Sequence, residues 1–364
     1  MIEIRILWFS HRDIKHSRMG GAERTIYEVG KRLVASGNEM KWFSVKEVSM
    51  PTNETYSGIS IIRLPNNLTA HLSVPIILKK EKYDVVVDDM GHAVPWGSEN
   101  FHHARGTVFF HHLHRRTLKG QVSLPQRILI SGLEAIYPLI YRDWPFISES
   151  NSSINDLISL GIDRRRIVKI LPGLNQENFQ KFDKTEFPSI VYFGGVKDYK
   201  RPWEAVYILK NLQEILKDTH LYFVGEGHSL TTVKQISEDI GVAHSITFTG
   251  RLSDTELKKV VGKSWVNIHS SVAEGFGFSI IESSALGTPT IAYDVPGVNE
   301  AIIDGSNGIL VENGNRNEML KALLRILQGY PDDWASRSTE VAKKYTWDKT
   351  ADLWEGHLQE ISGL

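Results

Sequence analysis

The chain has 364 residues, enough for two domains that each bury a hydrophobic core. It contains no cysteine, which excludes disulfide bonds, thiolate-ligated zinc, iron–sulfur clusters and a cysteine nucleophile. The net charge of -1 combines a basic and an acidic half, because residues 1–173 carry 23 Lys and Arg against 17 Asp and Glu. A basic half indicates an anionic partner such as lipid headgroups, and uneven solvated charge explains the same count equally well.

No run of about 18 uncharged apolar residues occurs, so the sequence predicts no membrane-spanning helix. The chain passes from Met1 directly into an apolar run, without the basic segment and apolar stretch of a signal peptide. Together these features predict a cytoplasmic protein.

The first half alternates short apolar runs with amphipathic segments at a spacing typical of βα units. Strands are predicted, in chain order, at 4–9, 83–87, 107–110 and 145–148. A loop that contains Gly20 and Gly21 leads from the first strand into a helix that ends at Gly37. The polar, aperiodic stretch between Pro172 and Pro188 is interpreted as a linker.

After the linker the alternation is more regular. Strands are predicted at 190–193, 221–224, 246–249, 266–268, 290–293 and 309–311. Helices are predicted at 202–217, 229–240, 254–261, 279–287 and 316–329. Parallel strands joined by helical crossovers form a doubly wound α/β sheet, so the chain is predicted to contain two Rossmann-like domains. Ligands of such sheets bind beyond the carboxyl ends of the strands, and we therefore expect the site in the cleft between the domains.

The most distinctive local sequence is AEGFGFSIIE, residues 273–282. A strand is predicted to end near Ser270, and a glycine-containing loop leads into a helix whose N–H groups and dipole suit a phosphate. Glu274 lies in the loop and Glu282 about one turn inside the helix, where both carboxylates could accept hydrogen bonds from sugar hydroxyls. On spacing alone, a solvated Glu282 and glycines that only shape the turn explain the pattern equally well.

This element resembles the Glu-x7-Glu signature of retaining glycosyltransferases of the GT-B fold, family 4 (glycosyl transferases group 1), and SSALGTPTIA at 283–292 continues the match. Other segments match in order and spacing over nearly the whole chain: GGAE at 20–23, FISES at 146–150, LPG at 171–173, VGEG at 224–227, FTGRL at 248–252 and GSNGILV at 305–311. The resemblance implies a retaining enzyme that moves a hexosyl group from a UDP or GDP sugar to a glycan or lipid-linked acceptor, in glycoconjugate or cell-envelope synthesis.

The resemblance also implies the domain bounds. An acceptor-side domain covers residues 1–172 together with a C-terminal helix at about 346–364, and residues 173–188 form the hinge. A nucleotide-sugar-binding domain covers 189–345. Trp347 and Trp354 of the C-terminal helix are expected to couple the two domains during closure.

By resemblance, Glu274 contacts the donor sugar and Glu282 contacts the ribose. Gly20 and Gly21 approach the diphosphate from the other domain, where a side chain would block the backbone. The backbone groups expected to hold the sugar and the diphosphate are those of Gly275, Phe276, Gly277, Phe278 and Ser279. Those expected at the nucleobase are Gly250, Arg251 and Leu252.

The second phosphate element is FGGVKDYKRP, residues 193–202. The family usually has an Arg and a Lys here, and both neutralise the diphosphate. Lys200 stands at the Lys position, but Gly195 stands at the Arg position, and the loss of one cation weakens charge stabilisation of the leaving diphosphate. Either Lys197 or Arg201 substitutes for the missing cation, or the activity is weak or altered.

The run FHHLH, residues 110–114, follows a predicted strand. By resemblance a His here reaches the 6-hydroxyl of the sugar, and His111 matches that position better than His112. With Glu274 and Lys200, His111 completes the expected catalytic residues. A metal site and histidines without chemistry are the alternatives, but adjacent loop histidines without a carboxylate motif suit zinc poorly.

The sequence contains no Asp-x-Asp, the tripeptide with which the other large glycosyltransferase fold holds a divalent ion. Its absence agrees with stabilisation of the diphosphate by Lys200 and a helix N-terminus, so we expect no metal and no other cofactor. Glu274 and Glu282 both lie on the donor side, which does not fit the flanking carboxylates of hydrolytic retention. The family's usual proposal is a front-face route in which the departing phosphate helps to deprotonate the acceptor.

Acceptor contacts are expected from the basic first half. Arg115, Arg116, Lys119 and Arg127 flank the apolar stretch 128–141. An interfacial helix on an anionic membrane surface and a core helix with a basic outer face both explain this pattern. The first explanation places the enzyme peripherally on the inner face of the membrane; neither implies a nucleic acid partner.

The sequence is also compatible with other functions. The main alternative is a GT-B subunit without catalysis that binds nucleotide or a partner protein, because Gly195 removes a cation, and donor turnover distinguishes the two. A GT-B epimerase or phosphorylase is a further alternative. A nicotinamide dehydrogenase is disfavoured, since no Gly-x-Gly-x-x-Gly follows the first strand and no acidic residue lies about 20 positions further on.

Overall fold

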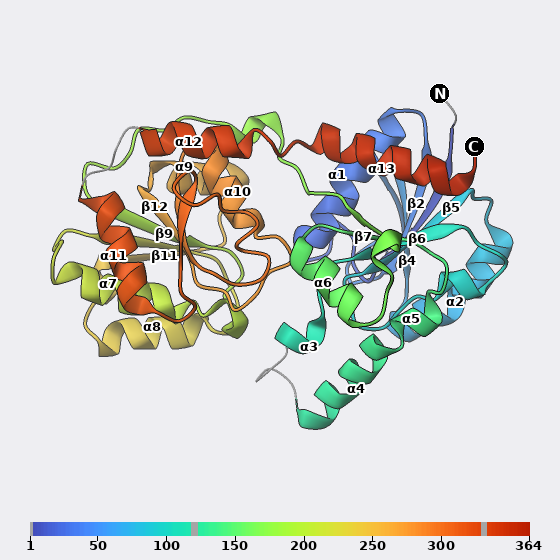
Figure 1. Cartoon of the computed structure of the whole chain (residues 1–364), viewed down its shortest axis with the longest axis horizontal. Helices are drawn as coiled ribbons and strands as arrows, with labels where there is room; N and C mark the ends of the chain where they lie inside the picture. Colours follow the sequence, from blue (N-terminus) through green and yellow to red (C-terminus); the bar gives the residue numbers. More distant parts are fainter. Residues whose placement is uncertain (1–2, 118–122, 329–332) are drawn as a thin grey trace. The chain divides into compact units, whose positions relative to one another are not determined.

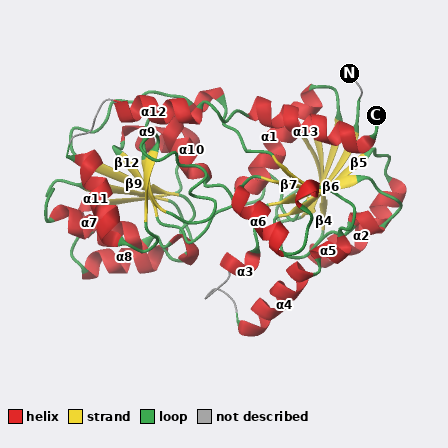
Figure 2. Ribbon diagram, viewed as in Figure 1, coloured by secondary structure: helices red, strands yellow, loops and turns green. Residues whose placement is uncertain are grey.

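The computed structural model describes residues 3–117, 123–328 and 333–364 (Figure 1). The chain divides into two compact units. Unit 1 consists of Met1–Gly173 and Thr346–Leu364, and unit 2 consists of Leu174–Tyr345. Each unit is built on one sheet with helices on both faces (Figure 2).

Within the described residues, unit 1 contains an eight-stranded sheet in the order β3-β4-β2-β1-β5-β6-β7-β8. Neighbouring strands are parallel except β3 and β4, which pair antiparallel at one edge. The strands are β1 Arg5–Phe9, β2 Glu39–Val45, β3 Asn53–Tyr56, β4 Ile59–Leu64, β5 Val85–Met90, β6 Gly106–Phe110, β7 Phe146–Ser148 and β8 Ile167–Lys169. The helices are α1 Gly21–Ala35, α2 Asn67–Lys80, α3 His114–Thr117, α4 Leu124–Ala135, α5 Tyr137–Ile140, α6 Asn151–Ser159 and α13 Trp347–Ser362.

Unit 1 has a hydrophobic core on each face of its sheet, because successive strand residues point to opposite faces. Leu7 and Phe9 of β1 pack with apolar residues of α2 and α6, whereas Ile6 and Trp8 pack with α1 and α13. The ring of Trp8 lies 4.8 Å from that of Trp354, measured between centroids. The C-terminal helix α13 is therefore part of the core of unit 1.

Within the part of the chain that the structure describes, unit 2 contains a six-stranded parallel sheet in the order β11-β10-β9-β12-β13-β14. This is the strand order of the Rossmann fold. The strands are β9 Ser189–Phe193, β10 His220–Val224, β11 Ile246–Gly250, β12 Val266–His269, β13 Thr290–Tyr293 and β14 Gly308–Val311. The helices are α7 Trp203–Gln213, α8 Leu230–Asp239, α9 Asp254–Lys263, α10 Phe278–Ala285, α11 Arg316–Leu327 and α12 Asp333–Ala342.

The α/β class and the strands predicted for unit 2 are confirmed, but the sequence interpretation missed β2, β3, β4, β8 and α2 in unit 1. In β4 a charged residue hides the apolar pattern, because Arg63 is buried and its Nε lies 2.7 Å from Asp13 Oδ2. Strand β3 is a partly exposed edge strand of polar sequence. Helix α2 contains Pro75, a residue that usually interrupts a helix.

Residues 174–188, expected as most of the hinge, belong to unit 2. Lys184 Nζ donates hydrogen bonds to the carbonyl oxygens of Ser264 and Gly287, at 2.7 and 3.0 Å. The Trp265 indole N–H donates to the carbonyl of Thr185 at 2.8 Å. The segment is thus bound along unit 2, and the chain passes from one unit to the other at 173–174 and at 345–346.

Candidate active site

The carboxyl ends of β9 and β12 meet where the strand order of unit 2 reverses. From β9 the chain continues to β10 on one side, and from β12 it continues to β13 on the other. In a doubly wound sheet ligands bind in the crevice outside the strand ends at this switch point. The two loops that begin there are 194–202, after β9, and 270–277, after β12.

Lys200 and Glu274 come from these two loops and form an ion pair, with Lys200 Nζ 2.8 Å from Glu274 Oε1. Ser271 Oγ donates to the same oxygen at 2.7 Å, and His269 Nε2 lies 3.5 Å from it. Two of the expected catalytic residues are therefore in direct contact, although 74 residues of sequence separate them.

Both members of the pair stay charged. Burial alone would raise the pKa of Glu274, but Lys200 and His269 outweigh burial and hold it well below its usual range. Burial would lower the pKa of Lys200, but Glu274, with Tyr199 and Tyr192, raises it above its usual value. A cation and a carboxylate side by side suit a ligand that carries both phosphate and hydroxyl groups.

The N-terminus of α10 follows Glu274 directly. Its N-cap Gly277 has a φ of 77°, a left-handed conformation that favours glycine. The N-cap residue makes no side-chain cap hydrogen bond and the first turn holds no acidic residue, so no acidic side chain of that turn offsets the positive end of the helix dipole. Phe276 is buried, Phe278 and Ser279 are half-buried, and Glu282 lies half-buried one turn into the helix.

The loop after β13 holds Glu274 in place, and the sequence analysis missed this contact. The Glu274 N–H donates to the carbonyl of Pro296 at 3.0 Å. A Cβ on Gly297 would lie 2.0 Å from the carbonyl oxygen of Glu274, so only glycine allows this approach. The Pro-Gly pair directly after a predicted strand was the available sequence signal.

Arg201 is not placed as a free cation. Its Nε donates to the carbonyl of Ser270 at 2.8 Å, and its Nη2 donates to the carbonyl of Ser271 at 3.0 Å and to Asn313 Oδ1 at 2.7 Å. Its guanidinium also lies 4.7 Å from the centroid of the Tyr293 ring. Arg201 therefore braces the loop that carries Glu274.

The other two residues of the second phosphate element are Gly195 and Lys197. Lys197 is exposed. A Cβ on Gly195 would meet only Lys197 Cε, at an ordinary contact distance of 3.6 Å.

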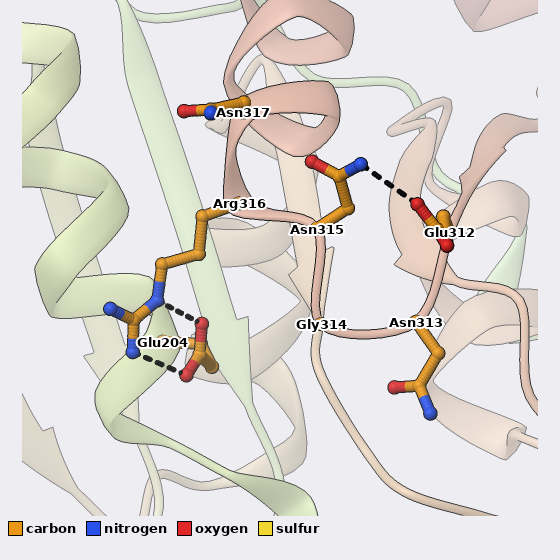
Figure 3. Close-up of a pocket in the computed structure, with 7 residues that line it drawn as sticks. All are labelled: Glu204, Glu312, Asn313, Gly314, Asn315, Arg316 and Asn317. Atoms are coloured by element: carbon orange, nitrogen blue, oxygen red, sulfur yellow. Dashed lines mark hydrogen bonds and ion pairs between the residues drawn. The ribbon is translucent and has the colours of Figure 1, made fainter.

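A recess of about 550 Å³ lies beside the loop between β14 and α11 (Figure 3). Its polar side chains bond to one another: Arg316 Nε and Nη2 each lie 2.7 Å from an oxygen of Glu204, and Asn315 Nδ2 donates to Glu312 Oε2 at 2.9 Å. Because these groups already satisfy one another, the recess is a weaker candidate for a charged substrate than the switch point.

The segment expected at the nucleobase begins at Gly250, the last residue of β11, which is an edge strand of the sheet of unit 2. Gly250 has a φ of 67°, and its carbonyl accepts a hydrogen bond from the Gly225 N–H at 2.9 Å. Arg251 is exposed and Leu252 is half-buried. This segment lies two strands from β9 in the sheet order.

Gly20, Gly21 and His111 belong to unit 1. Gly20 is the N-cap of α1, its N–H donates to Glu23 Oε2 at 2.7 Å, and Gly21 begins the helix. His111 is buried, with Nε2 2.6 Å from Asp89 Oδ1 and Nδ1 3.4 Å from Glu149 Oε2.

The two carboxylates set the charge state of His111. Burial alone would lower its pKa, but Asp89 and Glu149 raise it to about 10. Both ring nitrogens already have partners, so contact with a sugar hydroxyl would require one of them to change partner. His112 is half-buried, and its ring centroid lies 5.0 Å from that of His114.

Two family models match consecutive parts of the chain. The model for Glycosyltransferase Family 4 matches residues 19–178, and the model for Glycosyl transferases group 1 matches residues 175–344. The chain belongs to the glycosyltransferases that these two models describe. It is 24% identical, over 92% of both chains, to an uncharacterized glycosyltransferase of Methanocaldococcus jannaschii.

Solved structures with the GT-B fold are similar to this glycosyltransferase over nearly their whole length. Sucrose-phosphate synthase of Thermosynechococcus elongatus has a TM-score of 0.80 at 19% identity, over 98% of each chain. HepE of Anabaena in complex with UDP-glucose has a TM-score of 0.78 at 14% identity, over 98% of this chain and all of that one. The GT-B fold is thereby shown.

None of the helices in 3–117, 123–328 and 333–364 is both long and apolar enough to cross a membrane. In the same residues no group of three or more His, Asp or Glu side chains is arranged to hold a metal ion.

Proposed function

We propose that this glycosyltransferase moves a hexosyl group from a UDP or GDP sugar to a glycan or lipid-linked acceptor, with retention at the anomeric carbon and without a metal ion. The Lys200–Glu274 pair at the switch point of unit 2 carries the proposal. The HepE structure, which shares the fold, holds UDP-glucose, and this supports a nucleoside-diphosphate hexose as the donor.

In this proposal Lys200 stabilises the leaving diphosphate. Negative charge develops on the diphosphate as its bond to the anomeric carbon breaks, and a fixed cation lowers the energy of that state. Lys200 keeps its proton at neutral pH, so it supplies one positive charge. The N-terminus of α10 adds the positive end of the helix dipole. Together they supply the charge that a divalent ion would otherwise supply.

In this proposal Glu274 binds the donor sugar. Its carboxylate is ionised. It accepts hydrogen bonds from sugar hydroxyls once the Lys200 ammonium group contacts the diphosphate instead. A nucleophilic role is not favoured, because its Oε1 is shared by Lys200, Ser271 and His269. Retention is instead assigned to a front-face route. The acceptor oxygen bonds to the anomeric carbon on the side from which the diphosphate leaves, and a diphosphate oxygen takes the acceptor's proton.

The donor is identified by thermal stability across a panel of nucleotides and nucleotide sugars with EDTA present. A ligand at 100 times its dissociation constant stabilises a protein by about 2.7 kcal/mol. Stabilisation by one nucleotide series in EDTA would support the proposal. Stabilisation only after added Mg²⁺ would overturn the metal-free donor site, and no stabilisation by any nucleotide would favour a subunit without catalysis that binds a partner protein.

Substitution of Lys200 tests the mechanism. We expect Lys200→Met to lower kcat by about 100-fold to 1,000-fold, the loss typical when one group that stabilises developing charge is removed. Lys210→Met, an exposed lysine of α7, is the matched control. A Lys200→Met enzyme as active as the control would contradict the assignment of Lys200.

We also propose that unit 1 contacts an anionic membrane surface, which would place the enzyme peripherally on the cytoplasmic face. Helix α4 extends away from the sheet of unit 1 (Figure 1), and Leu124, Ile128 and Leu129 are 63–65% exposed on it. Tyr137 and Tyr141, from the same apolar stretch, are buried in the core. The stretch thus divides into a core-facing and an outward-facing part, and only the second suits a membrane. Lys119 lies outside the described residues.

A further inference from the structure

Four histidines gather at the carboxyl edge of the sheet of unit 1, apart from the residues assigned above. His11 follows β1, His92 follows β5, His114 begins the helix after β6, and His71 comes from α2. We call them the histidine cluster. Strands β1 and β5 are the pair at which the strand order of unit 1 reverses, so His11 and His92 lie beyond the strands of its switch point.

The four side chains form a chain of contacts. His11 Nε2 lies 3.1 Å from His71 Nε2. Ring centroids are 4.7 Å apart for His11 and His92, and 6.1 Å apart for His92 and His114. The Trp96 ring closes one side, 4.6 Å from the His11 ring and 4.4 Å from the His71 ring.

His11 has an unused polar atom. The residue is 9% exposed, and its Nδ1 is buried without a hydrogen-bond partner among the described residues. A buried polar atom without a partner costs free energy, so one retained at the ligand-binding position of a fold indicates a missing partner. The position therefore suits a ligand that engages an imidazole nitrogen.

Arg12 is the cation beside the cluster, and each of the neighbouring carboxylates Glu23, Asp89 and Glu134 has at least one partner. Glu23 Oε1 lies 2.7 Å from Arg12 Nε, and Asp89 is bound to His111. Glu134 accepts from the His114 N–H. Burial lowers the pKa of His11 to about 2, and His92, His71 and Arg12 contribute to the same shift, so its ring is neutral in the free protein.

We propose that the histidine cluster, with Arg12, binds a phosphoryl group of the acceptor; this rests on the proposed function and names the acceptor class as phosphorylated. Imidazole and guanidinium N–H groups donate strong hydrogen bonds to phosphate oxygens, and a bound anion favours protonated imidazoles. A metal ion fits less well, because no suitable set of three ligands exists among the residues that the structure describes.

Nuclear magnetic resonance of the full chain, with ¹⁵N-labelled histidines, tests the binding with inorganic phosphate as the probe. We expect saturable movement of the His11 and His92 ring signals toward the protonated form, which sodium chloride does not reproduce. His11→Asn should weaken phosphate binding about tenfold or more. His92→Asn, at an exposed residue, is the second variant if the first fails to fold, and exposed His244 of unit 2 supplies the control His244→Asn.

Equal movement with sodium chloride, or no movement with phosphate, would overturn the inference. The same samples are tested for stabilisation by nucleotides. If nucleotides stabilise the protein and phosphate leaves the histidines unmoved, the inference fails while the proposed function stands. If phosphate moves the histidines and no nucleotide stabilises the protein, the phosphate site stands and the proposed glycosyl transfer fails.

Vesicles distinguish a lipid phosphate from a small phosphorylated acceptor. Phosphatidylcholine vesicles that contain phosphatidic acid carry a phosphate monoester, and those that contain phosphatidylglycerol carry a diester, at a lipid fraction chosen to give the same surface charge. Stronger wild-type binding to the first, lost in His92→Asn, assigns a lipid-linked phosphate. Equal binding to both, with inorganic phosphate still bound, assigns a small phosphorylated acceptor.

Discussion

By resemblance, Gly195 stands where the family usually has an Arg that accompanies the Lys at position 200. A Cβ there would meet only Lys197 Cε, at 3.6 Å, so a longer side chain can start from this backbone. Arg201 is held by the carbonyls of Ser270 and Ser271 and by Asn313, and it is poorly placed to compensate. The position is thus one where the missing cation can be restored.

We expect Gly195→Arg to tighten nucleoside-diphosphate binding about tenfold, because a charge-assisted hydrogen bond contributes about 1.5–3 kcal/mol. Isothermal titration with UDP and GDP measures the change. Gly132→Arg adds the same charge to α4 of unit 1, where a Cβ meets nothing within 4 Å, and serves as the control. Unchanged affinity in Gly195→Arg would mean that another cation, such as Lys197, already occupies the place.

His111 couples the stability of unit 1 to pH. Its pKa is about 10 in the folded protein, because Asp89 and Glu149 outweigh burial, and near 6.5 when unfolded. The folded state therefore binds the proton more tightly. The stabilisation is complete below about pH 6.5 and is lost as the pH rises through 10, by at most about 1.4 kcal/mol per pH unit.

Urea unfolding between pH 6 and pH 10 tests this coupling against His111→Gln. The difference in unfolding free energy between wild type and variant should shrink as the pH rises. His357, half-buried in the same unit, is the contrast, because burial lowers its pKa and its contribution is lost as the pH falls. A difference for His111→Gln that does not change with pH would contradict a charged His111.

The members of the candidate site could be predicted from the sequence, but their contacts could not. Glu274 and Lys200 stand in recognisable glycine-containing loops after predicted strands. Their 2.8 Å contact depends on the strand order, which places β9 beside β12, and no local pattern encodes that order. For the same reason the partners of His111 were missed: Asp89 and Glu149 lie on the loops or ends of neighbouring strands.

At the scale of elements, prediction of strands succeeded in unit 2 and failed for several strands of unit 1 in which polar or charged residues interrupt the apolar run. The strands of unit 2 are short apolar runs between helices, and their pattern is strong. In unit 1, β4 buries Arg63 against Asp13, and such an ion pair has no signature in hydropathy. Helix α4 shows the converse, because an apolar sequence there lies partly on the surface.

The exposed apolar side chains of α4 predict membrane binding. Ile128→Glu should lower the affinity of the enzyme for phosphatidylglycerol vesicles, because it removes apolar burial and places a negative charge at an anionic surface. Vesicle sedimentation with phosphatidylcholine as the neutral comparison measures this. The matched control is Ile158→Glu on α6, since Ile158 is another exposed isoleucine of unit 1, at 41%. Equal loss in both variants would contradict a specific role for α4.

At the scale of the whole molecule, two crossings of the backbone connect the units. Leu174 N–H donates to the carbonyl of Tyr345 at 3.2 Å within unit 2. Within unit 1, Gly173 lies so close to the returning chain that a Cβ on it would be 2.2 Å from the Trp347 nitrogen. The two crossings therefore run side by side, and α13 is seated in unit 1 directly after the second one.

This arrangement predicts opposite effects for two glycine substitutions. Gly173→Ala must displace the backbone at Thr346 and Trp347, so it should destabilise unit 1 by about 1–3 kcal/mol. Gly356→Ala, on the exposed face of α13 with nothing within 4 Å, should stabilise the same unit by about 0.5–1 kcal/mol through helix propensity. Both substitutions add one methyl group, so the difference in stability between the two variants reports the surroundings of that group.

Hydrogen exchange followed peptide by peptide separates the two units in this comparison. Faster exchange in α13 and β1 of Gly173→Ala, with unit 2 unchanged, is expected because Trp354 of α13 packs directly on Trp8 of β1. Slower exchange in the same peptides is expected for Gly356→Ala. If Gly173→Ala exchanged like wild type, the two crossings would not be packed as closely as the 2.2 Å approach requires, and α13 would be held in unit 1 by its aromatic contacts alone.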